Sequence, residues 1–147
     1  MAPSTKERGG HAFRVALGSL AALGLAISVY LTWTHFAGVA PACAGGSHGC
    51  ETVQSSRYAK ILGTPVSVVG LVGYASLLLS AALRTESGVY LRFFLTLVGT
   101  LFSAYLTYLE FFVVRAICQW CLASAGVMVA ALICATLEVW WLTNERG

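Results

Sequence analysis

The sequence is short of charge. Asp, Glu, Lys and Arg make up 10% of its 147 residues, whereas a soluble domain usually carries about 25%. Its nine Lys and Arg are scattered between apolar segments, which argues against a nucleic-acid-binding surface. No nucleotide or flavin motif is present, and Leu122 after Cys121 excludes the CxxCH pattern of c-type haem attachment. Apolar residues are abundant instead, at 58% with a mean hydropathy of +0.78, which favours an integral membrane protein.

Four long apolar runs account for this composition. They contain 22, 22, 25 and 25 residues and span residues 15–36, 62–83, 90–114 and 118–142. A bilayer core about 30 Å thick requires about 20 apolar residues as helix, and backbone inside it must be hydrogen-bonded internally. The sequence therefore predicts an all-α integral membrane protein, with residues 15–142 forming a bundle of four transmembrane helices.

The basic residues predict how this bundle is oriented. An even number of spans puts both termini on one side, together with six of the Lys and Arg, whereas the loops 37–61 and 115–117 on the other side hold three. The positive-inside rule then places the termini in the cytoplasm. Residues 1–14 are expected to be a disordered cytoplasmic tail, and residues 143–147 a C-terminal tail. The first run exceeds the about 7–15 residues of a signal-peptide core, so we expect it to be retained.

The strongest local motif is Cys118-Gln-Trp-Cys121, where the fourth run begins. Residues three apart share a helix face, so the two sulfurs can form a disulfide. A cysteine at a helix N-terminus has a lowered pKa, and the thiolate is the attacking species in disulfide exchange. We therefore interpret Cys118 as the exchanging sulfur and Cys121 as the sulfur that a lipid-soluble acceptor reaches. Half of a zinc site is the alternative, although a structural zinc needs four ligands.

A second cysteine pair, Cys43 and Cys50, lies in the first outer loop. Three glycines among the six intervening residues make this loop flexible, which suits a disulfide that moves to meet another. A structural staple is the alternative, and the six-residue spacer disfavours a zinc site built from all four cysteines. Two cysteine pairs at the same outer end of the bundle can pass electrons from one to the other by disulfide exchange, and these electrons need a final acceptor. A quinone dissolved in the membrane is the natural one.

Two further features of the sequence suggest roles. Residues 51–62 fit a short interfacial helix that covers the bundle, with Val53, Tyr58, Ile61 and Leu62 on one face. Glu110 is an acidic residue inside the third run, where a carboxylate by default suggests function, here proton transfer. Because it lies near the outer end, a salt bridge to Arg115 or simple exposure at the interface are equally good interpretations.

Taken in order, these motifs resemble the bacterial branch of the vitamin K epoxide reductase family. The cysteine pair of the first loop is followed by Gly49-Cys-Glu51 and Ser55-Ser-Arg-Tyr58, and then by Leu62-Gly-Thr-Pro65 at the start of the second run. The segment Tyr105-Leu-Thr-Tyr-Leu-Glu110 precedes the CxxC. The resemblance covers nearly the whole chain after the N-terminal tail.

This resemblance implies a four-helix bundle around a quinone, either ubiquinone or menaquinone, in a bacterial cell membrane. Cys121 would interact with the quinone, Cys118 would exchange with Cys50, and Cys43 would face the partner. The partner would be a thioredoxin-fold, DsbA-like oxidase that oxidises newly exported proteins outside the membrane. No metal or nucleotide cofactor is implied.

The resemblance also suggests which residues line the quinone pocket: Val53, Ser56, Val66, Leu106 and Ala125. The animal enzymes grip vitamin K with an Asn and a Tyr, and the corresponding positions here are Val66 and Ala125. This difference disfavours epoxide reduction and favours quinone reduction.

Three other interpretations remain open at this point. A DsbB-type disulfide oxidase also has four helices and two cysteine pairs, but its CxxC lies in the first outer loop, whereas here the CxxC comes last. A non-enzymatic membrane protein would hold its cysteines as permanent structural disulfides. A metal-binding membrane module would bind zinc and contain no reducible disulfide.

Overall fold

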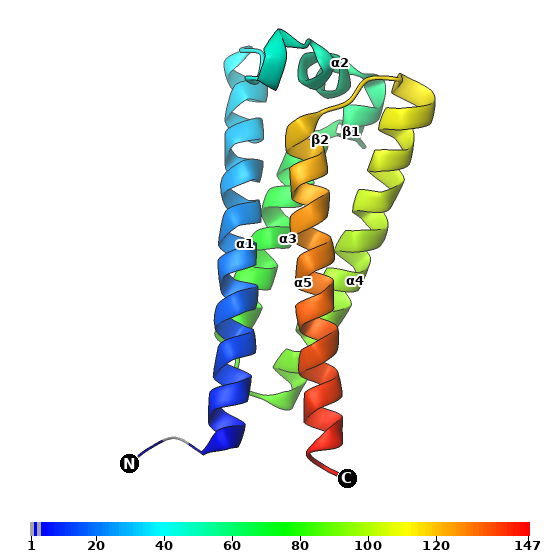
Figure 1. The fold of residues 1–147 in the computed structure, drawn as a ribbon. Helices are drawn as coiled ribbons and strands as arrows, with labels where there is room; N and C mark the ends of the chain where they lie inside the picture. Colours follow the sequence, from blue (N-terminus) through cyan, green and yellow to red (C-terminus); the bar gives the residue numbers. More distant parts are fainter. Residues whose placement is uncertain (1, 3) are drawn as a thin grey trace.

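Four long helices stand side by side in the computed structural model, which describes residue 2 and residues 4–147 (Figure 1). They are α1 (Thr5–Ala37), α3 (Val66–Ala81), α4 (Glu86–Tyr108) and α5 (Gln119–Asn144). Helices α1 and α4 do not pack extensively on each other, and each of them packs against both α3 and α5. Both chain ends lie at one end of the bundle, and the α1–α3 connection covers the other end (Figure 1).

Helix α1 begins ten residues earlier than predicted, so the expectation of a disordered tail is wrong for residues 5–14. The side chains of Ser4 and Glu7 each accept a hydrogen bond from the other residue's backbone N–H, a capping box that starts the helix. Further along, the rings of Phe13 and Trp141 lie 6.4 Å apart, and a Cβ atom on Gly9 would meet the Trp141 ring. This first part of α1 is therefore capped at its start and packed against the end of α5.

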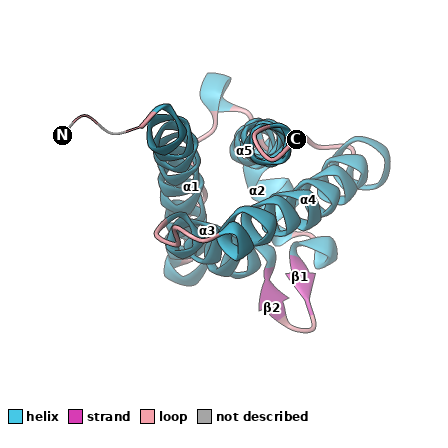
Figure 2. Cartoon of the chain, turned by 90° about the horizontal axis from the view of Figure 1, so that it is seen from below, coloured by secondary structure: helices cyan, strands magenta, loops and turns pink. Residues whose placement is uncertain are grey.

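The α1–α3 connection contains five short elements. These are η1 (Ala44–Gly46), α2 (Gly49–Ser55), η2 (Arg57–Ala59), β1 (Lys60–Ile61) and β2 (Thr64–Pro65). The predicted interfacial helix over 51–62 is thus present in shortened form as α2, which starts and ends earlier. Figure 2 shows the two strands projecting beyond the helices on the side of α3 and α4.

Helix α3 begins at Val66, four residues later than predicted, because the chain turns sharply before it. Leu62 and Gly63 have φ values of 51° and 81°, and positive φ at both central residues is typical of a tight two-residue hairpin turn. The turn pairs Lys60 with Pro65 and Ile61 with Thr64 in antiparallel register. The apolar run that starts at Leu62 therefore contains a hairpin arm before the helix.

Helix α4 begins four residues earlier than the third apolar run. The Thr85 side chain accepts a hydrogen bond from the Gly88 N–H and caps the helix. Helix α4 continues into η3 (Leu109–Val114), a wide π-helical turn, and Arg115 with φ 55° ends it. π-helical turns inside helices occur frequently at functional sites.

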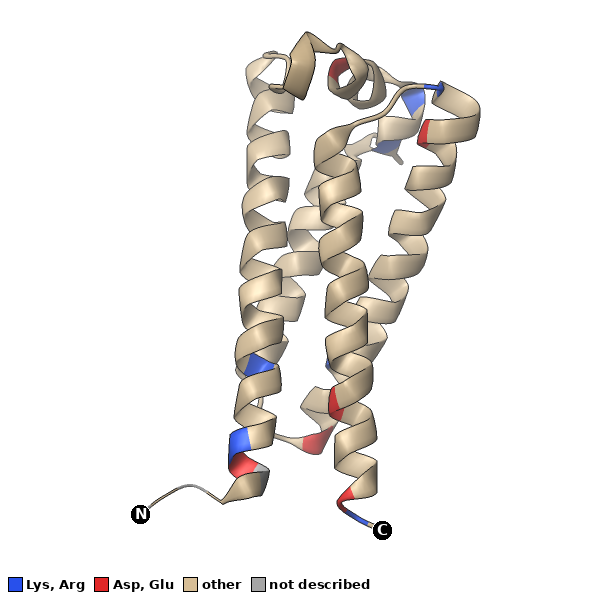
Figure 3. Ribbon diagram, viewed as in Figure 1, with Lys and Arg blue, Asp and Glu red and all other residues tan. Residues whose placement is uncertain are grey.

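Within the described part of the chain, three helical segments are long and apolar enough to cross a membrane: Glu7–Ala37, Glu86–Val114 and Gln119–Asn144. Helix α3 is also apolar, but its 16 residues extend about 24 Å, less than the about 30 Å hydrocarbon core. Charged residues gather at the two ends of the bundle, and its middle is uncharged (Figure 3). The fold thus contains the predicted four helices, three of which have full membrane-spanning length.

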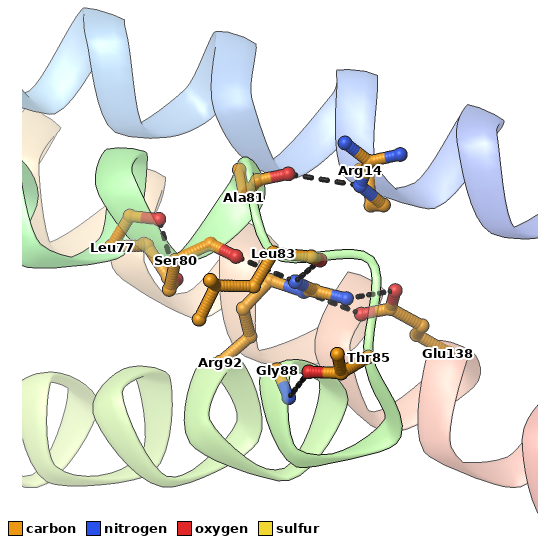
Figure 4. Close-up of polar contacts among 9 residues, drawn as sticks. All are labelled: Arg14, Leu77, Ser80, Ala81, Leu83, Thr85, Gly88, Arg92 and Glu138. Atoms are coloured by element: carbon orange, nitrogen blue, oxygen red, sulfur yellow. Dashed lines mark hydrogen bonds and ion pairs between the residues drawn. The ribbon is translucent and has the colours of Figure 1, made fainter.

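A buried polar cluster ties the helices together at the end that holds the termini (Figure 4). The Arg92 guanidinium donates to both carboxylate oxygens of Glu138, at 2.9 and 2.6 Å, and its Nη1 donates to the carbonyls of Ser80 and Leu83. The Arg14 Nε donates to the Ala81 carbonyl at 2.9 Å. The two arginines therefore donate to backbone carbonyls at the C-terminal end of α3 and in the turn that follows it, where the helical hydrogen-bond pattern stops.

Candidate active site

The CxxC motif lies at the first turn of α5. Cys118 is the N-cap residue, and its Sγ accepts a hydrogen bond from the Cys121 N–H at 3.4 Å. Its side chain is completely buried, Cys121 is partly buried, and both are free thiols. The prediction that the motif starts the fourth helix is confirmed, and both sulfurs lie on its first turn.

The pKa of Cys118 is lowered from the ordinary value of a thiol. The largest cause is a hydrogen bond from the Cys121 thiol, and the backbone N–H groups of Cys121 and Trp120 add to it. Burial and the nearby Glu110 carboxylate oppose this effect without overcoming it. Cys118 is therefore the sulfur of the motif suited to attack a disulfide.

The lowered pKa predicts how the thiolate forms with pH. In a Cys43→Ser/Cys50→Ser background, where Cys118 has no disulfide to attack, thiolate absorbance near 240 nm should rise at a lower pH than for an ordinary thiol. Thiolate forms as pH increases through the pKa, so a lowered pKa moves this rise to the acid side. Adding Cys121→Ala should move it back toward higher pH because the donor is removed. A rise at the same pH in both variants would contradict the assigned cause.

The second cysteine pair is a disulfide that joins the loop after α1 to helix α2. Cys43 and Cys50 are bonded, with their Cα atoms 6.2 Å apart. Cys50 is completely buried, whereas Cys43 is partly exposed. This bond is inconsistent with a zinc site that uses all four cysteines as thiolate ligands.

The two residues between the CxxC cysteines hold the loop that carries Cys43. The Trp120 Nε1 donates to the Ala42 carbonyl at 2.6 Å, and the Gln119 Oε1 accepts from the Ala44 N–H at 3.0 Å. The hydroxyl of Tyr30 accepts from the Ala42 N–H at 2.9 Å. The backbone on both sides of Cys43 is thus fixed to the motif, a contact between distant segments that the sequence did not predict.

Helix α2 packs directly on the chain that enters the CxxC. A Cβ atom on Gly49 would overlap the carbonyl oxygen of Ile117, so glycine at this position allows the two backbones to approach closely. Because Gly49 precedes Cys50 and Ile117 precedes Cys118, this contact brings the segments of the two buried cysteines together.

Glu110 lies beneath the CxxC, on the π-helical turn. Its side chain is 3% exposed, and its Oε2 accepts a hydrogen bond from the Cys118 N–H at 3.2 Å. The interpretation of simple interfacial exposure is therefore wrong. Among the described residues, Glu110 also forms no ion pair with Arg115. The wide turn directs this carboxylate inward, which the sequence could not indicate.

A cavity of about 310 Å³ lies between the four long helices and reaches both Cys121 and Glu110. Its wall is mostly apolar, and its polar side chains include Gln54, Tyr74 and Ser124. The Gln54 amide nitrogen lies 3.8 Å from the Cys121 Sγ, and the Tyr74 hydroxyl donates to the Ser124 carbonyl at 2.8 Å. An apolar pocket with a few directed polar groups is typical of small-molecule sites.

The structure separates the five predicted quinone-pocket residues into three groups. Val66 and Leu106 line both this cavity and a smaller one of about 40 Å³. Val53 and Ser56 line the smaller cavity alone, and Ala125 lines neither. The cavity-facing side of α5 is formed by Cys121, Ser124 and Met128, spaced by three and four residues. Ser124 therefore takes the place predicted for Ala125.

Two residues that line this cavity, Gln54 and Tyr74, are not among the pocket residues predicted from the sequence. A helix over 51–62 with an apolar face toward the bundle does not predict a pocket role for Gln54. In the structure, the shorter α2 directs the Gln54 side chain toward Cys121. Tyr74 could have been identified from the sequence, because a hydroxyl-bearing side chain within the uncharged run 62–83 needs a polar partner inside the bundle. A Cβ atom on Gly24 would overlap the Tyr74 ring, so this glycine makes room for the tyrosine inside the bundle.

A comparison with protein families agrees with this geometry. The model of the vitamin K epoxide reductase family matches residues 15–136, which include α3, α4, most of α1 and α5, and both cysteine pairs. It is a family of oxidoreductases that use quinones as electron carriers and generally work with thioredoxin-like partners. The match covers most of the chain, and the chain therefore belongs to the vitamin K epoxide reductase family.

Proposed function

We propose that this protein is a membrane thiol:quinone oxidoreductase that reoxidises a thioredoxin-fold partner and so supports disulfide formation in exported proteins. One observation carries the proposal. Cys121 of a dithiol lines an apolar cavity, while Cys118 of the same motif lies where the disulfide-bearing helix packs. The dithiol thus lies between a disulfide on one side and, on the other, a cavity that suits a lipid-soluble electron acceptor.

The proposed cycle moves two electrons and two protons in each step. The partner dithiol reduces the Cys43–Cys50 disulfide and itself becomes a disulfide. The Cys50 thiolate then attacks the Cys118–Cys121 disulfide at Cys118, and Cys43 resolves the mixed disulfide. Finally the Cys118–Cys121 dithiol closes to a disulfide while the quinone becomes a quinol. The more exposed Cys43 suits contact with the partner, and the buried Cys50 suits exchange with Cys118.

The quinone is proposed to lie in the cavity beside Cys121. Apolar walls suit the ring and its isoprenoid chain, and the Gln54 amide can donate a hydrogen bond to a quinone oxygen. Ubiquinone and menaquinone both fit this chemistry. Epoxide reduction is disfavoured because Val66 lines the cavity at the position where the animal enzymes use an Asn to grip vitamin K.

The proposed location is the bacterial cell membrane, with all four long helices in the bilayer, cytoplasmic termini and the cysteines at the outer face. The termini lie together at the end opposite the CxxC (Figure 1), and the excess of Lys and Arg lies at their end. The partner would then approach Cys43 from the extracytoplasmic side.

Quinol formation under anaerobic conditions tests this proposal. The detergent-purified protein should reduce a soluble quinone when supplied with either a reduced DsbA-like partner or dithiothreitol. Cys43→Ala should lose the partner-driven reaction and keep the dithiothreitol-driven one, because a small thiol can reduce the CxxC directly. Equal loss of both reactions would contradict the relay. No turnover with any quinone would contradict the enzyme itself and favour a structural disulfide.

Glu110 is proposed to deliver the proton that quinone reduction requires. We expect Glu110→Gln to lower the rate of quinol formation roughly 100-fold, within the range for loss of a general acid. The amide oxygen can still accept the Cys118 N–H, so exchange between the two cysteine pairs should continue at its normal rate. Stopped-flow measurement of both steps distinguishes them, and an unchanged quinol rate would exclude the proton role.

A further inference from the structure

A second, larger cavity opens at the opposite end of the bundle from the CxxC motif and the Cys43–Cys50 disulfide. It has a volume of about 860 Å³ and lies between the start of α1, the α3–α4 connection and the end of α5. Its basic lining residues come from three elements and are Arg8, His11, Arg14, Arg84 and Arg92. Apolar contacts are supplied by Val89, Trp141 and Leu142.

Each carboxylate in this lining already has a partner. Glu138 is bonded through both oxygens to Arg92, with both side chains almost completely buried. Glu86 pairs with Arg146, and Glu7 accepts the Ser4 N–H at the start of α1. Each of the three glutamates therefore makes a structural contact within the protein.

Three arginines of the lining retain unused donors. Arg8 and Arg84 are exposed and form no ion pair with any described residue. Arg14 uses its Nε on the Ala81 carbonyl, and Figure 4 shows its two terminal nitrogens pointing away from the residues drawn. Four arginines against three glutamates give the lining a net charge of +1, and Arg146 on Glu86 raises it further.

We propose that this cavity binds a phosphate group, carried either by an anionic phospholipid or by a soluble phosphate ester. Arginine guanidinium groups bind phosphate oxygens through paired hydrogen bonds, and basic pockets between membrane helices bind lipid headgroups. The side chains of Val15 and Trp140, exposed near this end of α1 and α5, offer an apolar surface for acyl chains. The site is separate from the redox centre and would fix the ends of three helices to the ligand.

Native mass spectrometry and thermal unfolding of the full chain in detergent test this site. The probes are phosphatidylglycerol, phosphatidylcholine with the same acyl chains, and glycerol 3-phosphate. Arg8→Gln/Arg84→Gln changes two exposed residues of the cavity. Arg57→Gln/Lys60→Gln removes the same charge from exposed positions at the cysteine end and serves as the matched control. Circular dichroism of both variants checks that they remain folded.

A lipid site predicts retention of phosphatidylglycerol over phosphatidylcholine, reduced roughly tenfold or more in the cavity variant and unchanged in the control. A soluble-ester site predicts that glycerol 3-phosphate raises the unfolding temperature of the wild type and of the control but not of the cavity variant. Equal effects of the two double variants, or no preference among the three probes, would overturn the proposal.

Discussion

Replacing Cys121 with serine should reduce quinone reduction roughly a thousandfold or more, as loss of a covalent catalytic residue does. Cys121 is the sulfur of the motif that lines the cavity, and serine can neither form a disulfide nor donate two electrons. Without Cys121, the Cys118 thiolate can exchange only with the Cys43–Cys50 disulfide, by attack at Cys50 that releases the Cys43 thiolate. Alkylation of the released Cys43 prevents the reverse step and should therefore trap a Cys50–Cys118 disulfide, detectable by mass spectrometry of peptides prepared without reduction.

Cys134 provides the matched control for this experiment. It is a free cysteine on the same helix, partly buried against the core formed by Leu17, Ala21, Leu77, Ala131 and Ala135. Cys134→Ser should keep full activity because the residue lies on neither cysteine pair and does not line the cavity beside Cys121. Substantial turnover in Cys121→Ser, or a trapped disulfide to another cysteine, would reject the assigned order of the relay.

The largest loss of stability is expected from Arg92→Met. This change leaves the Glu138 carboxylate buried without its cation, and breaking a buried ion pair from one side costs about 3–5 kcal/mol in the free energy of unfolding. It also removes one hydrogen bond from each of the Ser80 and Leu83 carbonyls, of which Ser80 keeps the Leu83 N–H. Denaturant titration in mixed micelles, followed by helical circular dichroism, measures the loss.

Two further variants separate the charge effect from the lost hydrogen bonds. Arg92→Met/Glu138→Met removes both charges and should recover much of the stability, although the two carbonyls remain without their donor. Arg57→Gln, at an exposed loop position, should leave the free energy of unfolding nearly unchanged. If the double variant were as unstable as Arg92→Met alone, the uncompensated charge could not be the cause.

The apolar runs predicted the four helices because burial in lipid leaves the backbone few alternatives. Their ends were predicted less well, since Ser4 and Thr85 extend α1 and α4 through local caps outside the runs. The early end of the interfacial helix and the late start of α3 depend on a turn at Leu62 that apolar composition conceals.

Within the site, the four cysteines were predictable because their chemistry is carried by residue type and spacing. The directions of other side chains were not. Glu110 turns inward because of a π-helical turn, and Gln54 reaches Cys121 because α2 ends early. The pairing of Arg92 with Glu138 depends on the relative rotation of two helices, which hydropathy does not specify. In the sequence both residues lie near the ends of apolar runs, and nothing there indicates that they pair.

The shortness of α3 has a consequence for the surrounding lipid. A 16-residue helix falls about 6 Å short of an average hydrocarbon core, and a bilayer adapts to such hydrophobic mismatch by thinning beside the short segment. Leu62 is fully exposed at the tip of the hairpin that leads into α3. Its side chain could contact the lipid in this thinned region. A quinone that arrives on that side would have a shorter distance to travel from the bilayer midplane to Cys121, the sulfur proposed to reduce it.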